Sequence, residues 1–308
     1  MSPNFIPIII FLSVFLTAYT WWLVSVYLDS PCSDATLAQY SRLSRHCTSL
    51  AHQEKYHSSY LDSKISHFWA PTWSCPLAED IGHTTDAIGG SKWVCDVDHI
   101  DSDCVVYSFG TTTNYTFEME MNSRFDCEVH IFDPFVLPSG TAENIHHHTW
   151  NSKSHKIEKI ADTVLKLGHA GQDIDVISFN VHGCELAILD NPLFLSELNK
   201  IATRIDQIIV TVITSPETDY RYCDSPPKVA LKAVQELFQF FSRNGYAVFH
   251  REHKHEFAYY HGDEWGTPGD ARHVEHPTAG SVTEFSFVRL NYNCDSKIFT
   301  SNSKYVSF

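Results

Sequence analysis

The stretch from Asp103 to Pro134 restricts the fold of this chain more than any other. It begins with a short apolar and β-branched run, Cys104 to Phe109, which is typical of a buried parallel strand. Gly110 follows at once, where a chain that leaves a strand needs an unhindered backbone. A short helix is expected over Tyr115 to Asn122, and a second strand over Cys127 to Phe132. The pattern therefore predicts a strand, a tight turn, a helix and a second strand.

The second predicted strand ends on Asp133. An acid at this place, about 20 residues after a glycine turn, is typical of a site that binds the hydroxyl groups of a ribose. The turn has one glycine rather than GxGxxG, which argues against a pyrophosphate and favours a nucleoside without phosphates, of which S-adenosylmethionine is the common one. The alternative is a plain βαβ unit in which Asp133 only caps a loop, and these residues alone do not separate the two.

Strands and helices alternate along the rest of the chain. Helices are expected over Lys156 to Leu167, from Glu185 until Pro192 interrupts the chain, and from Ser225 to Asn244. The further expected strands are Ile174 to Val181, Ile205 to Ile213, Tyr246 to His250 and Thr283 to Leu290. Such alternation predicts an α/β fold with a mostly parallel sheet and helices on both faces.

The overall charge argues against one class of partner. The formal net charge is -15, and no run of Lys and Arg interrupts it. A nucleic-acid backbone would be repelled by such a chain, so DNA and RNA are not expected as partners.

Residues Phe5 to Leu28 are apolar and carry no charge. As a helix this segment would be about 36 Å long, enough to cross a bilayer. An uncleaved signal anchor is favoured over a cleaved signal, whose apolar core is usually shorter. The basic residues Arg42 and Arg45 favour a cytosolic body, whereas the cysteine count and the sequon at Asn114 favour a lumenal one. We expect a lumenal body in the endoplasmic reticulum or Golgi, with secretion after cleavage as the alternative.

The nine cysteines fall into two groups. Cys104, Cys127 and Cys184 lie in or beside expected strands and are predicted to be small buried thiols. The others lie in loops or flanks, where pairing is plausible in an oxidising compartment. These are Cys32, Cys47, Cys75, Cys95, Cys223 and Cys294. No CxxC pair occurs, which argues against a structural zinc site.

Three consecutive histidines, His146 to His148, raise the question of a metal ion. Side chains alternate between the two faces of a strand, so all three cannot face one ion. No metal site is predicted from this run.

Several phrases of the sequence, taken in order, resemble an animal methyltransferase-like family. They are GGSKWVCD (Gly89 to Asp96), DCVVYSFG (Asp103 to Gly110), FEMEM (Phe117 to Met121) and CEVHIFDP (Cys127 to Pro134). The family includes methyltransferase-like protein twenty-four and is distantly related to FkbM-type methyltransferases. The resemblance covers about Cys75 to Asn291 and implies a class I, S-adenosylmethionine-dependent methyltransferase fold. The expected division is a signal anchor (1–29), a stem and N-terminal extension (30–88), a methyltransferase-like domain (89–295) and a tail (296–308).

The carboxyl ends of the strands are where a ligand of such a sheet should lie. The residues expected to contact the cofactor there are Ser108, Phe109, Gly110, Thr111, Asp133 and Asn180.

The chain departs from the resembled family at the end of the fourth strand of the fold. The family pattern there is D-x-E-G-x-E, and this chain has Gly183 and Glu185 but replaces the first two acids by Asn180 and His182. His182 is a candidate general base for an acceptor hydroxyl, and His182 and Glu185 are the expected catalytic residues. The prediction is an enzyme that O-methylates a glycan or protein in the secretory pathway. The alternative is a catalytically inactive methyltransferase fold with a binding or structural role.

Overall fold

The computed structural model describes thirteen segments of the chain. They are residues 42–43, 45–47, 70–75, 77–83, 90–110, 115–133, 143–150, 159–181, 192–213, 230–253, 282–290, 292–293 and 298–299. The chain divides into two units, Met1–Ser44 with Phe308, and Arg45–Ser307. The fold below is that of the second unit.

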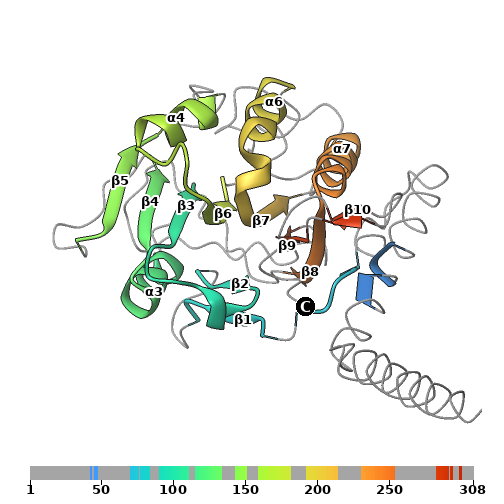
Figure 1. The fold of residues 1–308 in the computed structure, drawn as a ribbon, viewed down its shortest axis with the longest axis horizontal. Helices are drawn as coiled ribbons and strands as arrows, with labels where there is room; N and C mark the ends of the chain where they lie inside the picture. Colours follow the sequence, from blue (N-terminus) through green and yellow to red (C-terminus); the bar gives the residue numbers. More distant parts are fainter. Residues whose placement is uncertain are drawn as a thin grey trace, which may run out of the picture. The chain divides into compact units, whose positions relative to one another are not determined.

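A seven-stranded sheet with the order β5-β4-β3-β6-β7-β9-β8 is the centre of the described part of the chain (Figure 1). Its strands are β3 (Val105–Phe109), β4 (Glu128–Asp133), β5 (Ile145–Thr149), β6 (Ile174–Phe179), β7 (Ile205–Ile213), β8 (Tyr246–His253) and β9 (Val282–Arg289). The first five pair in parallel, and β9 runs antiparallel between β7 and β8. The expectation of a mostly parallel sheet is confirmed.

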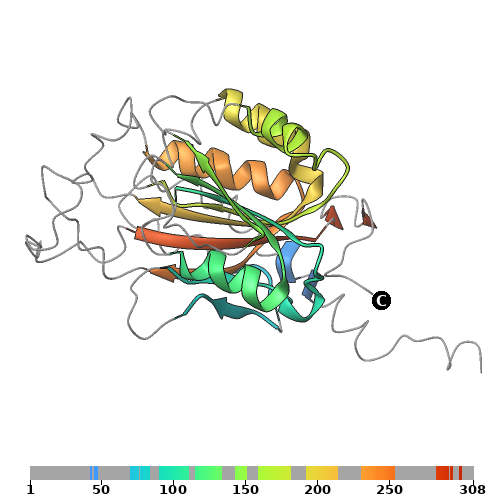
Figure 2. The same ribbon diagram turned by 90° about the vertical axis from the view of Figure 1, so that its left-hand side faces the viewer.

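Helices cover both faces of this sheet, as predicted (Figure 2). On one face lie α4 (Ile160–Lys166), α6 (Pro192–Ile201) and α7 (Ala230–Arg243), whose buried residues pack on phenylalanines of the strands. On the other lie α3 (Thr116–Phe125) and an antiparallel hairpin, β1 (Glu79–Ile81) with β2 (Lys92–Val94). Short elements complete the description: η2 (Val97–His99), η5 (Ala202–Arg204), β10 (Tyr292–Asn293) and β11 (Ile298–Phe299).

The hairpin β1–β2 and the helix α6 are absent from the sequence-based prediction. The hairpin β1–β2 has strands of only three residues, and it is fixed by tertiary contacts. Gln207 of β7 bonds both backbone groups of Cys95, at 2.7 and 2.9 Å. Pro192 begins α6, whereas the helix expected before it, from Glu185, lies outside the described residues. The first turn of a helix leaves its N–H groups unpaired, so a proline fits there.

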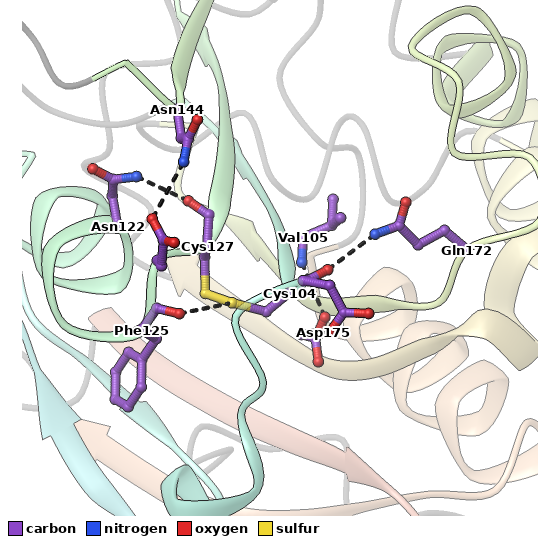
Figure 3. Close-up of a disulfide and its surroundings, with 10 residues drawn as sticks. Cys104, Val105, Asn122, Phe125, Cys127, Asn144, Gln172 and Asp175 are labelled. Atoms are coloured by element: carbon purple, nitrogen blue, oxygen red, sulfur yellow. Dashed lines mark hydrogen bonds between the residues drawn. A yellow bond between two sulfur atoms is a disulfide. The ribbon is translucent and has the colours of Figure 1, made fainter.

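The prediction that Cys104 and Cys127 are thiols is wrong, because their sulfur atoms form a disulfide (Figure 3). Each cysteine stands immediately before a strand, and the register pairs Val105 with Glu128. This brings the two Cα atoms to 4.7 Å, within the range for a disulfide. Figure 3 also shows the neighbouring hydrogen bond of 3.0 Å from the Val105 N–H to Asp175 Oδ2. The amino ends of β3 and β4 are thus covalently joined.

The expected pairing of loop cysteines has a counterpart in the structure. Cys75 and Cys95 form a disulfide that ties the segment before β1 to the end of β2. Cys47 is disulfide-bonded as well. Cys184 lies outside the described residues.

Within the described segments, we find no helix that combines the length and the apolar character needed to cross a bilayer. The anchor expected over residues 5–28 lies outside those segments and stays a prediction.

Candidate functional site

The candidate site lies at the carboxyl ends of β3, β4 and β6, where the strand order changes direction. Ligands of open α/β sheets bind at such a switch point. The N–H of Gly110 donates to Phe132 O at 2.9 Å, and the N–H of Asn180 donates to Phe109 O at 2.9 Å. Asp133 is the last residue of β4. The structure therefore brings Gly110, Asp133 and Asn180 to one edge of the sheet.

Gly110 is required by the protein's own packing. Its φ is +68°, a conformation that side chains disfavour. A Cβ atom there would lie 2.4 Å from Val181 Cγ1 and 2.6 Å from Asn180 O. The turn after β3 thus packs directly on the chain that leaves β6.

Asp133 is a carboxylate inside the protein, with 1% of its surface exposed. Its own carbonyl accepts from the Trp150 N–H at 3.1 Å, which continues the pairing of β4 with β5. Asp133 already interacts within the protein.

Ser108 and Phe109 were predicted as cofactor contacts, and their side chains point to opposite faces of the sheet. The Ser108 hydroxyl donates to Glu118 Oε1 beneath α3. The Phe109 ring stacks between Phe132 and Phe179, with ring centroids 4.5 and 5.2 Å away. Both side chains are buried in the protein interior, so they shape the strand end from within.

Glu118 is a buried acid beneath the site that the sequence-based reasoning did not single out. Burial raises its pKa, and the nearby Asp133 charge raises it further, while the Ser108 hydrogen bond and Lys92 lower it. Its position beside the apolar residue Phe117 and near Met121, on the buried side of α3, could have identified it in the sequence. An acid between two core residues of a helix is unusual enough to mark a functional or structural role.

Two buried polar atoms at this edge have no hydrogen-bond partner among the described residues. They are Asn180 Oδ1, on a residue that is 7% exposed, and Trp150 Nε1. Asn180 follows β6, and Trp150 follows β5. Leaving a buried polar group unpaired costs about 1–3 kcal/mol, so such atoms point to a place where a ligand can bond.

Three predicted site residues lie outside the described segments: Thr111, His182 and Glu185. Their roles therefore stay predictions.

The sequence matches the model of one protein family. The model of a family described as "Methyltransferase domain" matches residues 33–262, well over half of the 308 residues. No curated protein matches the sequence.

Solved structures with a similar fold include the following three. Fibrillarin in its complex with NOP5P is 10% identical, with a TM-score of 0.34 over 61% of this chain and 73% of that chain. TrmK of M. capricolum, in complex with S-adenosyl-homocysteine, is 11% identical, with a TM-score of 0.33 over 63% of this chain and 65% of its own, slightly less than two thirds. A putative ribosomal RNA methyltransferase from Plasmodium falciparum is 10% identical, with a TM-score of 0.34 over 63% and 91%. These identities and TM-scores are too low to support an argument about activity. That argument depends on the family match.

Proposed function

The chain belongs to the family described as a methyltransferase domain, and we propose that it is an S-adenosylmethionine-dependent methyltransferase. The family match gives the reaction class. The observation that supports a cofactor site in this chain is the unpartnered Oδ1 of Asn180, placed beside the Gly110 turn and the end of β4.

The residues at the switch point fit this cofactor. The Asp133 carboxylate can accept hydrogen bonds from the ribose hydroxyls. Asn180 Oδ1 can accept from an N–H group, and Trp150 Nε1 can donate to an acceptor atom. The missing side chain of Gly110 lets the turn after β3 pack directly against Asn180 and Val181. When bound, S-adenosylmethionine supplies a methyl group on a positively charged sulfur.

The proposed reaction is O-methylation of a glycan or protein acceptor. In it, His182 accepts the proton of the acceptor hydroxyl, and Glu185 is the second catalytic residue. The net charge of -15 disfavours nucleic acid as the acceptor. Within the broad family, the phrases quoted above favour the animal group that includes methyltransferase-like protein twenty-four.

The proposed location is the lumen of the endoplasmic reticulum or Golgi, with residues 5–28 as the anchor, or secretion after cleavage. Disulfides are typical of oxidising compartments and rare in the cytosol. The Cys75–Cys95 and Cys104–Cys127 disulfides support this part of the proposal.

A second candidate function is that of a catalytically inactive fold with a binding role. It is favoured by the neutral side chains of Asn180 and His182, which stand where the resembled family has acids. Without those charges, the hydrogen bonds that orient the cofactor or the acceptor are weaker.

Calorimetric titration of S-adenosylmethionine and S-adenosylhomocysteine into the full chain tests the proposal. We expect binding that weakens roughly tenfold or more in Asp133→Asn, because charge-assisted hydrogen bonds contribute about 1.5–3 kcal/mol each. The matched control is Asp98→Asn, since Asp98 is an exposed acid in η2. Its affinity should equal that of the wild type.

The outcomes separate the candidates. Absence of binding to folded wild-type protein would reject the enzyme and favour the inactive fold. Equal affinity of Asp133→Asn and Asp98→Asn would reject the ribose assignment of Asp133. If the cofactor binds, incubation with glycan and protein acceptors should release S-adenosylhomocysteine, and failure with all of them would again favour the inactive fold.

A further inference from the structure

A cluster of histidines lies along β4 and β5 and converges on Glu128, at the amino end of β4. Strand β4 contributes Glu128 and His130, and β5 contributes His146 and His148. The parallel register sets His130 opposite His146, so their rings lie on one face of the sheet, stacked with centroids 5.0 Å apart. His169, from the turn between α4 and β6, completes the cluster, and its ring meets that of His130 edge-on at 5.1 Å.

Three imidazole nitrogens of this cluster converge on one carboxylate. The Nε2 atoms of His130 and His146 lie 3.0 and 3.5 Å from Glu128 Oε1. The Nε2 atom of His169 lies 3.5 Å from Glu128 Oε2. In a tetrahedral zinc site with Zn–N distances of 2.0–2.1 Å, neighbouring donor atoms are about 3.3 Å apart. One donor atom from each of Glu128, His130 and His169 lies within 4.8 Å of the others, so small side-chain rotations would place these three around one ion. A rotation of the exposed His146 would add the fourth donor.

The Nδ1 atoms of His130 and His169 make hydrogen bonds to other residues of the protein. His130 Nδ1 is hydrogen-bonded to His148 Nε2 at 2.9 Å, and His169 Nδ1 to the Tyr107 hydroxyl at 2.6 Å. Tyr107 is fully buried on β3. Hydrogen bonds on the second nitrogen are what orient metal-binding histidines in known sites. The Nε2 atoms of His130 and His169 are thus directed towards Glu128 by the core of the protein.

The cluster is buried on one side and open on the other. His130 and His169 are buried, whereas the side chains of Glu128 and His146 are 41% and 44% exposed. An ion can therefore enter from solvent and meet the buried donors His130 and His169, which already face Glu128.

We propose that Glu128, His130, His146 and His169 bind a divalent transition-metal ion of the zinc class. Three imidazole nitrogens and one carboxylate oxygen suit zinc, whereas calcium and magnesium take oxygen ligands. The ion cross-links the edge strand β5, its neighbour β4 and the turn before β6.

This site is separate from the methyl-transfer site. Glu128 and Asp133 are the two ends of the six-residue strand β4. That separation is about 17 Å along the strand. The ion therefore has a structural role, and its binding does not depend on the proposed activity.

The test is calorimetric titration of zinc chloride into the full chain after removal of metals with a chelator. We expect one equivalent to bind. His146→Gln and Glu128→Gln should each weaken binding at least tenfold, since loss of a mere supporting group already costs about 10–100-fold. Both residues are partly exposed, so these variants should fold.

His147→Gln is the matched control, because it changes the adjacent histidine of the same strand. His147 pairs with Ile131 and lies on the opposite face from His146. Its zinc affinity should equal that of the wild type. The proposal is overturned if the wild type binds no stoichiometric zinc, or if His147→Gln weakens binding as much as His146→Gln does. Binding of S-adenosylhomocysteine should be unchanged in all three variants, which separates this proposal from the one above.

Discussion

The two ends of β4 differ in how their residues are brought together. At the carboxyl end, Gly110 and Asp133 come from one continuous strand–turn–helix–strand segment, and Asn180 joins them from the end of β6. At the amino end, Glu128 and His130 meet His146 from the next strand and His169 from a turn 39 residues beyond His130 in the numbering. A site within one segment can be read from local spacing, whereas a site between segments requires the register of the sheet.

The two ends also differ in how their polar groups are satisfied. The carboxyl end has buried atoms without partners in the described residues, Asn180 Oδ1 and Trp150 Nε1. At the amino end, the imidazoles of His130 and His169 are contacted at both ring nitrogens. The first arrangement suits an organic ligand that brings its own hydrogen-bonding groups, and the second suits an ion that replaces protons.

The largest effect should come from the carboxyl end, with Gly110→Val. The added side chain would collide with Val181 and would force a β-branched residue into a positive φ. We expect the free energy of unfolding to fall by about 3 kcal/mol or more, measured by urea denaturation. Gly171→Val is the control, because no atom lies within 4 Å of its Cβ position. If Gly110→Val left stability intact and only abolished cofactor binding, the inference that this turn packs on the residues after β6 would be rejected.

The next effect should come from the amino end, where Cys104→Ser with Cys127→Ser removes the disulfide. The cysteines are 23 residues apart, and closing such a loop stabilises a fold by about 3 kcal/mol. The free energy of unfolding, measured by thermal and urea denaturation, should fall by that amount, while the affinity for S-adenosylhomocysteine stays within about twofold of the wild-type value. The pair Cys75→Ser with Cys95→Ser, with a separation of 20, is the comparison. A large loss of cofactor affinity in the first double variant would contradict the independence of the two ends.

The smallest effect should be a change in pH dependence at the carboxyl end, from Glu118→Gln. Because the folded protein raises the pKa of Glu118, it holds this proton more tightly than the unfolded chain does. The associated stability is present below the ordinary glutamate pKa and is lost as the pH rises above it. The free energy of unfolding, measured by urea denaturation, should therefore fall less from pH 5 to pH 8 in Glu118→Gln than in the wild type. Glu236→Gln, on an exposed glutamate of α7, should follow the wild type. An identical pH dependence in all three proteins would mean that burial does not raise the pKa of Glu118.

The sequence was a good guide to elements and a poor guide to the contacts between them. Ile205 to Ile213 was predicted as a strand and is β7, and the alternation of His146 to His148 across a strand is confirmed. The hairpin β1–β2 was missed because its three-residue strands have too little pattern and depend on Gln207. The Cys104–Cys127 disulfide was missed because a buried thiol and a buried disulfide have the same local pattern.

The sequence by itself determined the doubly wound order of strands and helices and the acid at the end of β4, because these depend on side-chain periodicity and on neighbours in the chain. Only the tertiary structure decided that Glu118 is buried near the charge of Asp133, that Cys104 meets Cys127, and that three histidines face Glu128. Those contacts follow from which strands pair and in which register, and the packing of the whole sheet fixes both.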